Sequence, residues 1–153
     1  FLTFSFISAY ILRNDNLSFF LFTIIISAFS DIGGFVFGKV FKGPKLTVIS
    51  PNKTYSGSIG SFTLSIFSGC LYINFIDLSF NNILSIDFIE LLLIIFFLST
   101  INQIGDLIIS YYKRLKKIKN TGKILPGHGG LLDRIDGLIF TIPISHIIYL
   151  ILK

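Results

Sequence analysis

The feature that most constrains this chain is that its apolar residues fall in long continuous blocks instead of alternating with polar ones. Hydrophobic residues make up 52% of the 153 residues and charged residues only 14%, whereas soluble domains carry about 25% charged residues. A helix needs about 20 largely apolar residues to cross the roughly 30 Å hydrocarbon core of a bilayer. Four blocks reach or approach that length: 17–37, 54–76, 88–112 and 137–152. The sequence therefore predicts an all-α, polytopic transmembrane protein with about four complete spans.

A fifth apolar stretch, residues 1–12, has the composition of the end of a further span. Because the chain begins at Phe1 without an initiator Met, we expect it to be incomplete at its N-terminus. No repeat of fixed period and no Pro- or Ser-rich linker divides residues 1–153, which predicts a single transmembrane domain. The single cysteine excludes an intramolecular disulfide, and with only two histidines a structural zinc site is not expected.

Basic residues are concentrated in two connections between the blocks. Residues 39–53 contain four lysines and no acid, and residues 113–134 contain seven basic residues and one acid. The connection 77–87 has no basic residue. Basic loops of membrane proteins face the cytoplasm, and two spans separate the two basic connections. We therefore expect cytoplasmic loops at about 39–55 and 113–135, in a multi-pass protein of the inner (cytoplasmic) membrane.

Three acids interrupt the apolar blocks: Glu90 lies near the start of the block 88–112, whereas Asp31 and Asp106 each lie toward the predicted cytoplasmic end of a block. A carboxylate in hydrocarbon costs at least about 2.5 kcal/mol on insertion scales, so a functional role is the default interpretation. The alternative is that each acid snorkels to the surface or pairs with a nearby lysine. Asp106, Ser110 and Lys113 follow one another at i, i+4 and i+7, which puts them on one helix face. This polar stripe predicts a face toward the protein interior or a water-filled cleft.

The densest group of polar residues is the segment 113–136, KRLKKIKNTGKILPGHGGLLDRID. Asp133 and Asp136 are three residues apart and would share a face at the start of the last helix, where a carboxylate pair can hold a hard divalent cation with phosphate oxygens. Glycines on both sides of His128 let the backbone approach an anion, and the basic residues suit phosphates. The alternative is that the lysines are only the positive-inside signal and that the two acids cap the helix.

These residues resemble the C-terminal portion of the phosphatidate cytidylyltransferase (CDP-diacylglycerol synthase) family of polytopic membrane enzymes. The family signature runs approximately S-x-x-K-R, four residues, K-D, then a glycine and P-G-H-G-G-x-x-D-R-x-D. The matching residues are Ser110, Lys113, Arg114, Lys119, Gly122 and the block 126–136. Gly105-Asp106-Leu107 matches the family's G-D-L, Asp31 with Gly33 resembles its D-x-G/A element, and residues 50–57 resemble its S-P-x-K-T-x-E-G element. The resemblance covers roughly residue 30 to the end.

Three positions depart from the family pattern. Ser56 and Ile109 each stand where the family usually has Glu, and Asn120 stands where it has Asp. Each change removes an acid near the expected site, so a catalytically inactive scaffold or lipid-binding relative is one alternative. A cytidylyltransferase for another lipid phosphate is a second. A transporter is disfavoured, because the charged residues concentrate in one predicted cytoplasmic loop instead of at the midplane.

The resemblance implies that a cytidylyl group passes from CTP to phosphatidate, giving CDP-diacylglycerol and pyrophosphate, in a cleft open to both cytoplasm and bilayer. It implies Mg²⁺ held by Asp106, Asp133 and Asp136, with Asp31 ranked below them as a ligand for this or a second cation. The expected catalytic residues are Asp106, Asp133, Asp136, Lys119 and His128. The expected substrate-binding residues are Lys53, Ser110, Lys113, Arg114, Gly129, Gly130 and Arg134. A homodimer is expected by analogy alone, and no nucleic acid partner is expected.

Overall fold

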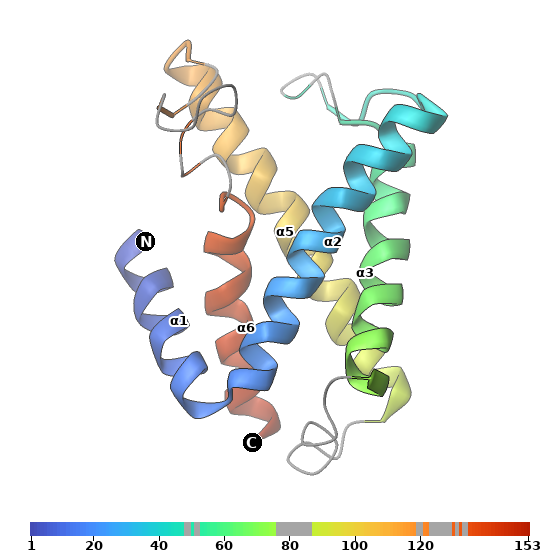
Figure 1. The fold of residues 1–153 in the computed structure, drawn as a ribbon. Coiled ribbons are helices and arrows are strands. Elements are labelled where there is room, and N and C mark those ends of the chain that lie inside the picture. The colour runs from blue at the N-terminus through green and yellow to red at the C-terminus, as the bar shows by residue number, and fades with distance from the viewer. Residues whose placement is uncertain are drawn as a thin grey trace.

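The computed structural model describes residues 1–47, 50, 53–75, 87–118, 121–122, 130, 132 and 135–153. Within these ranges the chain forms an all-helical bundle (Figure 1). Its helices are α1 (Leu2–Asp15), α2 (Leu17–Phe41), α3 (Tyr55–Phe75), α5 (Phe88–Leu115) and α6 (Leu138–Leu152). The described residues contain no strand beyond one isolated antiparallel bridge between Lys45 and Thr54. The predicted all-α class is confirmed.

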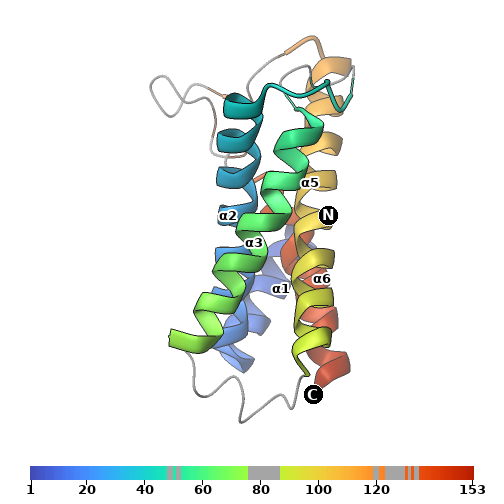
Figure 2. The same ribbon diagram turned by 90° about the vertical axis from the view of Figure 1, so that its right-hand side faces the viewer.

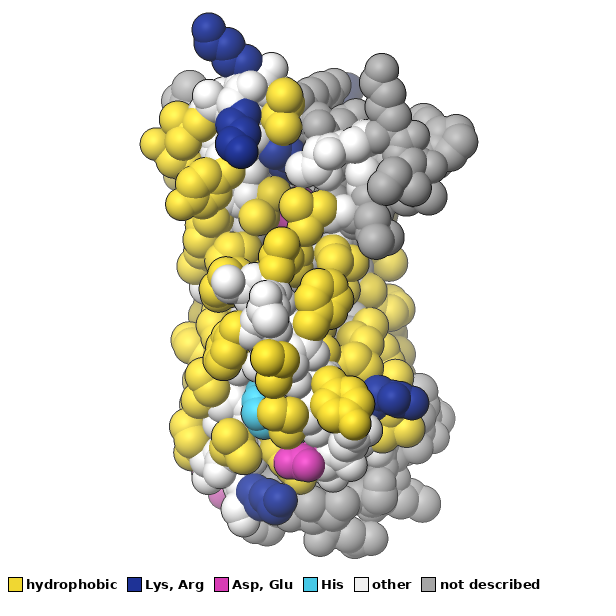
Figure 3. Space-filling view, turned by 90° about the vertical axis from the view of Figure 1, so that its left-hand side faces the viewer, with side chains coloured by type: hydrophobic (Ala, Val, Ile, Leu, Met, Phe, Trp, Pro, Cys, Tyr) yellow, Lys and Arg dark blue, Asp and Glu magenta, His cyan; other side chains and the backbone are white. Residues whose placement is uncertain are grey.

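Three of the helices, α2, α3 and α5, are long and apolar enough to cross a membrane, and α6 is a shorter apolar helix. The four predicted blocks therefore correspond to helices, although α2 continues to Phe41 and α5 to Leu115, beyond the expected ends at 37 and 112. The protein is a polytopic helical membrane protein. The space-filling view in Figure 3 shows one face covered largely by hydrophobic side chains, as expected for a surface in contact with lipid.

Local hydrogen bonds determine where two of the helices begin. Asn16 ends α1 and caps α2, because its side-chain oxygen accepts a 2.9 Å hydrogen bond from the backbone N–H of Phe19. At the start of α5, Asp87 and Glu90 form a capping box, in which the Glu90 carboxylate accepts from the Asp87 backbone N–H at 3.3 Å. Glu90, an apparent interruption of an apolar block, is therefore part of a helix start.

Helices α2 and α3 approach each other closely through glycines. A Cβ atom on Gly57 of α3 would lie 2.7 Å from the carbonyl oxygen of Gly34 of α2, and one on Gly60 would lie 2.8 Å from that of Gly33 and collide with the Phe37 side chain. Membrane helices associate through such small residues, because the lipid provides no hydrophobic driving force between them. Figure 2 shows the two helices crossing side by side.

The apolar core is concentrated in one half of the bundle. The core cluster comes from the beginning of α2 and α5 and the end of α1, α3 and α6: Leu12, Phe19, Phe22, Ile26, Tyr72, Leu91, Ile95, Leu98 and Tyr149. Figure 1 shows that these helix ends lie together, away from the α2–α3 connection. The end of α5, where the second basic connection begins, lies at the same end of the bundle as the α2–α3 connection, as predicted.

The glycine contact generates a first prediction, Gly60→Val. The added side chain meets the α2 backbone, which cannot move as a flexible side chain can, so we expect the helix pair to separate and the protein to lose about 1–3 kcal/mol or more of stability. Thermal unfolding in detergent micelles measures this loss. The control is the adjacent Ile59→Val, because Ile59 is 63% exposed. Equal unfolding temperatures of the two variants would contradict the close-contact interpretation.

Candidate functional site

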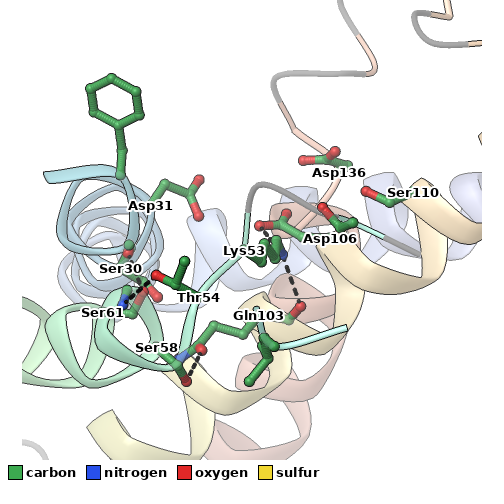
Figure 4. A pocket seen from close by; sticks show the side chains of 15 residues that line it. Ser30, Asp31, Lys53, Thr54, Ser58, Ser61, Gln103, Asp106, Ser110 and Asp136 are labelled. Carbon is green, nitrogen blue, oxygen red and sulfur yellow. Dashed lines mark hydrogen bonds and ion pairs between the residues drawn. The ribbon is translucent and has the colours of Figure 1, made fainter. Parts of the chain in front are cut away.

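A polar cavity of about 360 Å³ lies between α2, α3 and α5 at the end of the bundle that carries the basic connections. Its polar lining consists of Ser50 and ten residues that are labelled in Figure 4: Ser30, Asp31, Lys53, Thr54, Ser58, Ser61, Gln103, Asp106, Ser110 and Asp136. Apolar side chains of Phe35 and Leu46 also line it, and Phe35 is 69% exposed. The cavity therefore combines charged groups with an apolar side that continues onto the outer surface of α2.

Asp106 is held by Lys53, which comes from a different part of the chain. The Lys53 Nζ lies 3.2 Å from Asp106 Oδ2 and donates to the Gln103 carbonyl oxygen at 3.4 Å. The backbone around Lys53 folds back on itself, since the Leu46 N–H donates to the Lys53 carbonyl at 2.7 Å. This fold brings the lysine over α5. The other carboxylate oxygen, Asp106 Oδ1, is buried and accepts no hydrogen bond from the described residues.

Asp136 lies in the turn before α6 and is paired with the end of α5. Its Oδ1 accepts from the Gly137 N–H at 3.1 Å, and its Oδ2 lies 3.6 Å from Lys113 Nζ. Burial raises the pKa of Asp136 to about 7, and the neighbouring Asp106 carboxylate raises it as well, while Lys113 and the Gly137 N–H oppose the rise. A further positive charge nearby would lower this pKa, and Asp136 would then be fully ionised at neutral pH.

The last helix begins later than the spacing of the acids suggested. Gly137 is the N-cap and α6 starts at Leu138, so Asp136 lies ahead of the first helical turn instead of in it. Gly137 passes so close to α5 that a Cβ there would lie 2.9 Å from Asp106 Oδ1 and collide with Asn102. Asp133, the expected neighbour of Asp136 on that helix face, lies outside the described residues.

Asp31 faces the cavity from α2. Its Oδ1 accepts a 2.7 Å hydrogen bond from the side-chain amide of Asn102, and Figure 4 shows its carboxylate pointing toward that of Asp106. Among the described residues, the hydrogen-bond partner of Asp31 is thus a neutral amide. The sequence had left open that Asp31 pairs with a lysine or reaches the membrane surface. Asp31, Asp106 and Asp136 all line the same cavity, although they come from α2, α5 and the segment before α6.

The predicted polar stripe of α5 is confirmed. Asp106 and Ser110 line the cavity, and Lys113 continues their face to reach Asp136. Arg114 is exposed and is not among the lining residues, and Gly130 is buried beside Thr121 and Gly122. The remaining predicted site residues lie outside the described residues: Lys119, His128, Gly129, Asp133 and Arg134.

Sequence reasoning missed several polar residues that build the cavity wall. Ser58 of α3 donates to Gln103 Oε1 of α5 at 2.6 Å, while Gln103 Nε2 is buried with no hydrogen-bond partner among the described residues. Asn102 of α5 forms hydrogen bonds with α2 and α6. A signal was present, because Asn102 precedes Asp106 by four residues and therefore extends the stripe by one turn toward the apolar half.

The carboxylates fit a hard divalent cation by their chemistry. Carboxylate oxygens are the ligands that Mg²⁺ prefers, with waters and substrate phosphates completing its shell. The buried, unpartnered Asp106 Oδ1 beside Asp136 is an oxygen of this kind. In the part of the chain that the structure describes, no three acidic, histidine or cysteine side chains form a metal site on their own. A cation here would therefore also need oxygens from the substrate, water or the undescribed segment.

A membrane helix bundle with Lys53 and three carboxyl groups lining one cavity near its end defines the class of this chain: a polytopic helical membrane protein with a charged cavity. Residues 1–152 match the model of the Cytidylyltransferase family, and the chain belongs to this family.

Similar proteins include three from staphylococci that are named phosphatidate cytidylyltransferase. The chain is 39% identical to the Staphylococcus haemolyticus protein over 140 residues, which are 91% of this chain and 52% of that protein. It is 40% identical to the Staphylococcus epidermidis protein and 38% identical to the Staphylococcus aureus protein, each over 137 residues, 89% of this chain and 50% of the relative. The chain thus spans about half the length of these curated relatives.

The raised pKa of Asp136 generates a second prediction, on pH. Its ordinary value is 3.8 and its folded value is about 7, so between these values the folded state binds a proton that the unfolded state does not. Its contribution to stability is therefore present at low pH and is lost as pH rises toward 7. In EDTA, we expect unfolding temperatures of the wild type to fall relative to Asp136→Asn between about pH 5 and 7. Parallel pH curves for the two proteins would contradict the assignment.

Proposed function

We propose that this protein transfers a cytidylyl group from CTP to phosphatidate, giving CDP-diacylglycerol and pyrophosphate. Three findings support the proposal: the family membership, the names of the staphylococcal relatives, and the content of the cavity. The observation that carries it is the pair of lysine–carboxylate contacts, Lys53 with Asp106 and Lys113 with Asp136. Such pairs provide both the cations that phosphates need and the oxygens that a metal ion needs.

The reaction requires positioning and charge neutralisation more than covalent chemistry by the protein. A phosphate oxygen of phosphatidate attacks the α-phosphorus of CTP and forms a new P–O bond, while the bond to the β-phosphate oxygen breaks and pyrophosphate leaves in line. Lys53, Ser110 and Lys113 would bind phosphate oxygens and stabilise the charge that develops on them. Asp106 and Asp136, together with Asp133 as assigned from the sequence, would hold Mg²⁺, which would supply further neutralisation of the phosphate charge.

CTP is dissolved in water whereas phosphatidate lies in the bilayer, and the cavity has a feature suited to each substrate. The polar lining of the cavity suits the triphosphate, and Phe35 together with Leu46 provides an apolar wall beside it. Phosphatidate would keep its acyl chains in the bilayer against the outer face of α2. The side that carries the basic connections would face the cytoplasm of the cell, because basic loops are retained there. We accordingly propose the inner membrane as the location and the cytoplasm as the source of CTP.

Two of the three departures from the family pattern do not alter the cavity lining. The Ser56 hydroxyl lies 3.1 Å from Thr54 Oγ1 and accepts from the Gly43 N–H at 3.3 Å, so it supports the start of α3. Neither Ser56 nor Ile109 is among the residues that line the cavity, and Asn120 lies outside the described residues. The acids Asp31, Asp106 and Asp136 remain in place. These placements favour an active enzyme over an inactive scaffold.

The direct test uses the purified protein in detergent with phosphatidate, CTP labelled at the α-phosphate, and Mg²⁺. We expect label to pass into the lipid phase, and EDTA to abolish this transfer because the developing charge is then not neutralised. A parallel reaction with an isoprenoid phosphate as acceptor tests the other lipid substrate. Label that stays in the aqueous phase with every acceptor, in a protein that unfolds cooperatively, would contradict the proposal.

Substitution of Asp106 by Asn tests the central carboxylate. Asn keeps the shape but removes the charge that holds Lys53 and that a cation would need, so we expect kcat to fall by about 100-fold or more. Asp133→Asn tests the ligand assigned by sequence and should do the same. The control is Glu90→Gln, which removes an acid from the other end of α5, at the capping box. Unchanged turnover in Asp106→Asn would exclude the carboxylate from the reaction.

A further inference from the structure

Asn102 is a fully buried amide at the junction of three helices. Its exposed fraction is 0%, and it lies on α5 one helical turn before Asp106. Its Nδ2 donates to Asp31 Oδ1 at 2.7 Å and is 3.4 Å from the Ser27 carbonyl oxygen, both on α2. Its Oδ1 lies 3.4 Å from Thr141 Oγ1 of α6, whose single hydrogen is also within reach of the Gly137 carbonyl oxygen at 2.9 Å.

The orientation of this amide follows from its neighbours. An ionised carboxylate and a backbone carbonyl only accept hydrogen bonds, so the NH₂ group must face α2 and the oxygen must face the Thr141 hydroxyl. A hydrogen bond to a charged acceptor is stronger than one between neutral groups, and 2.7 Å is a short distance for it. The Asp31 carboxylate is therefore held in one direction by a group that cannot itself rotate freely.

The carboxylates of the cavity differ in whether the group that contacts them is charged. Lys53 neutralises Asp106, and Lys113 neutralises Asp136. An amide, by contrast, stabilises the Asp31 carboxylate in a membrane helix without cancelling its charge. Among the described residues that line the cavity, Asp31 is thus the carboxyl group whose hydrogen-bond partner carries no charge. When it is ionised, it offers a negative charge that a bound cation can balance.

Asn102 also supports the opposite side of the cavity. A Cβ on Gly137 would collide with Asn102 Oδ1, so the amide packs directly against the backbone that follows Asp136. Asp31, Asp106 and Asp136 thus all lie around this one buried side chain, on α2, α5 and the turn before α6. Figure 4 shows the three carboxylates directed into the same space.

We propose that Asn102 is a positioning residue, which fixes the Asp31 carboxylate in the cavity as an anionic group for a divalent cation. The inference rests on the proposed function in treating the cavity as a cation-assisted phosphate site. A purely structural role, in which the amide only joins α2, α5 and α6, is the alternative. The two differ in whether Asn102 affects ligand binding through Asp31.

The test measures Mn²⁺ binding to the protein in detergent micelles, from the loss of the free Mn²⁺ signal in electron paramagnetic resonance. Removing a group that orients a metal ligand typically weakens metal binding 10- to 100-fold, so we expect Asn102→Ala to weaken it at least about tenfold. Asp31→Ala should weaken it similarly, and the double variant no more than Asp31→Ala alone, because both changes act through one carboxylate. Asn102→Leu, of nearly the same shape, replaces Asn102→Ala if the latter does not fold.

The matched control is Ser65→Ala. Ser65 is also fully buried, and its hydroxyl lies within hydrogen-bond distance of two other helices, 3.4 Å from the Ile26 carbonyl oxygen of α2 and 3.2 Å from Ser99 Oγ of α5, but it does not line the cavity. We expect it to lower the unfolding temperature and leave Mn²⁺ affinity unchanged. The proposal is overturned if the Asn102 variants bind Mn²⁺ as the wild type does, if the effects of Asn102→Ala and Asp31→Ala multiply, or if the wild type binds no Mn²⁺.

Parallel assays of lipid labelling separate this inference from the proposed function. The expected Mn²⁺ pattern without any labelled lipid would contradict only the cytidylyl transfer. If labelled lipid forms but the Asn102 variants bind Mn²⁺ as tightly as the wild type, only the positioning role would be contradicted.

Discussion

The structure depends on one constraint, which is that a charge in a membrane helix needs a compensating group. Each of the described acids near the cavity has one, and the groups differ in kind. Lys53 reaches Asp106 from the α2–α3 connection, Lys113 reaches Asp136 from the end of α5, and a buried amide serves Asp31. Because these partners come from separate segments, satisfying the charges also brings α2, α3, α5 and the turn before α6 together. The site and the packing of that end of the bundle are therefore one set of contacts.

The two halves of the bundle are stabilised differently for the same reason. The half remote from the basic connections holds large apolar side chains such as Phe19, Phe22 and Ile95. In the other half, α2 and α3 meet through glycines, and serine hydroxyls such as that of Ser61 donate to the backbone of the opposite helix. Small residues allow the backbones to come close, and this close approach brings the cavity walls within reach of one another.

Much of the fold could be predicted, since the length of an apolar block and the sign of its flanking charges are local properties. The blocks form helices, and the end of α5, where the second basic connection begins, lies at the same end of the bundle as the first. The boundaries were less accurate: α2 continues to Phe41, and α6 begins after Asp136, where Gly137 passes against α5. Asn102 was missed although its spacing from Asp106 extends the polar stripe, because the spacing does not show that its amide meets Asp31 on another helix. Of the predicted metal ligands, Asp106 and Asp136 line the cavity, whereas Asp133 falls in a segment outside the described residues.

The amino-acid sequence by itself determined the class of the protein, because apolar blocks of this length are compatible only with helices in a bilayer, and the order of its motifs pointed to its family. Which lysine meets which acid was decided by the tertiary structure. Lys53 and Asp106 are 53 positions apart, and Asp31 and Asn102 are 71 apart. Such pairs follow from how closely α2, α3 and α5 cross, which is a matter of interhelical packing that no single segment encodes.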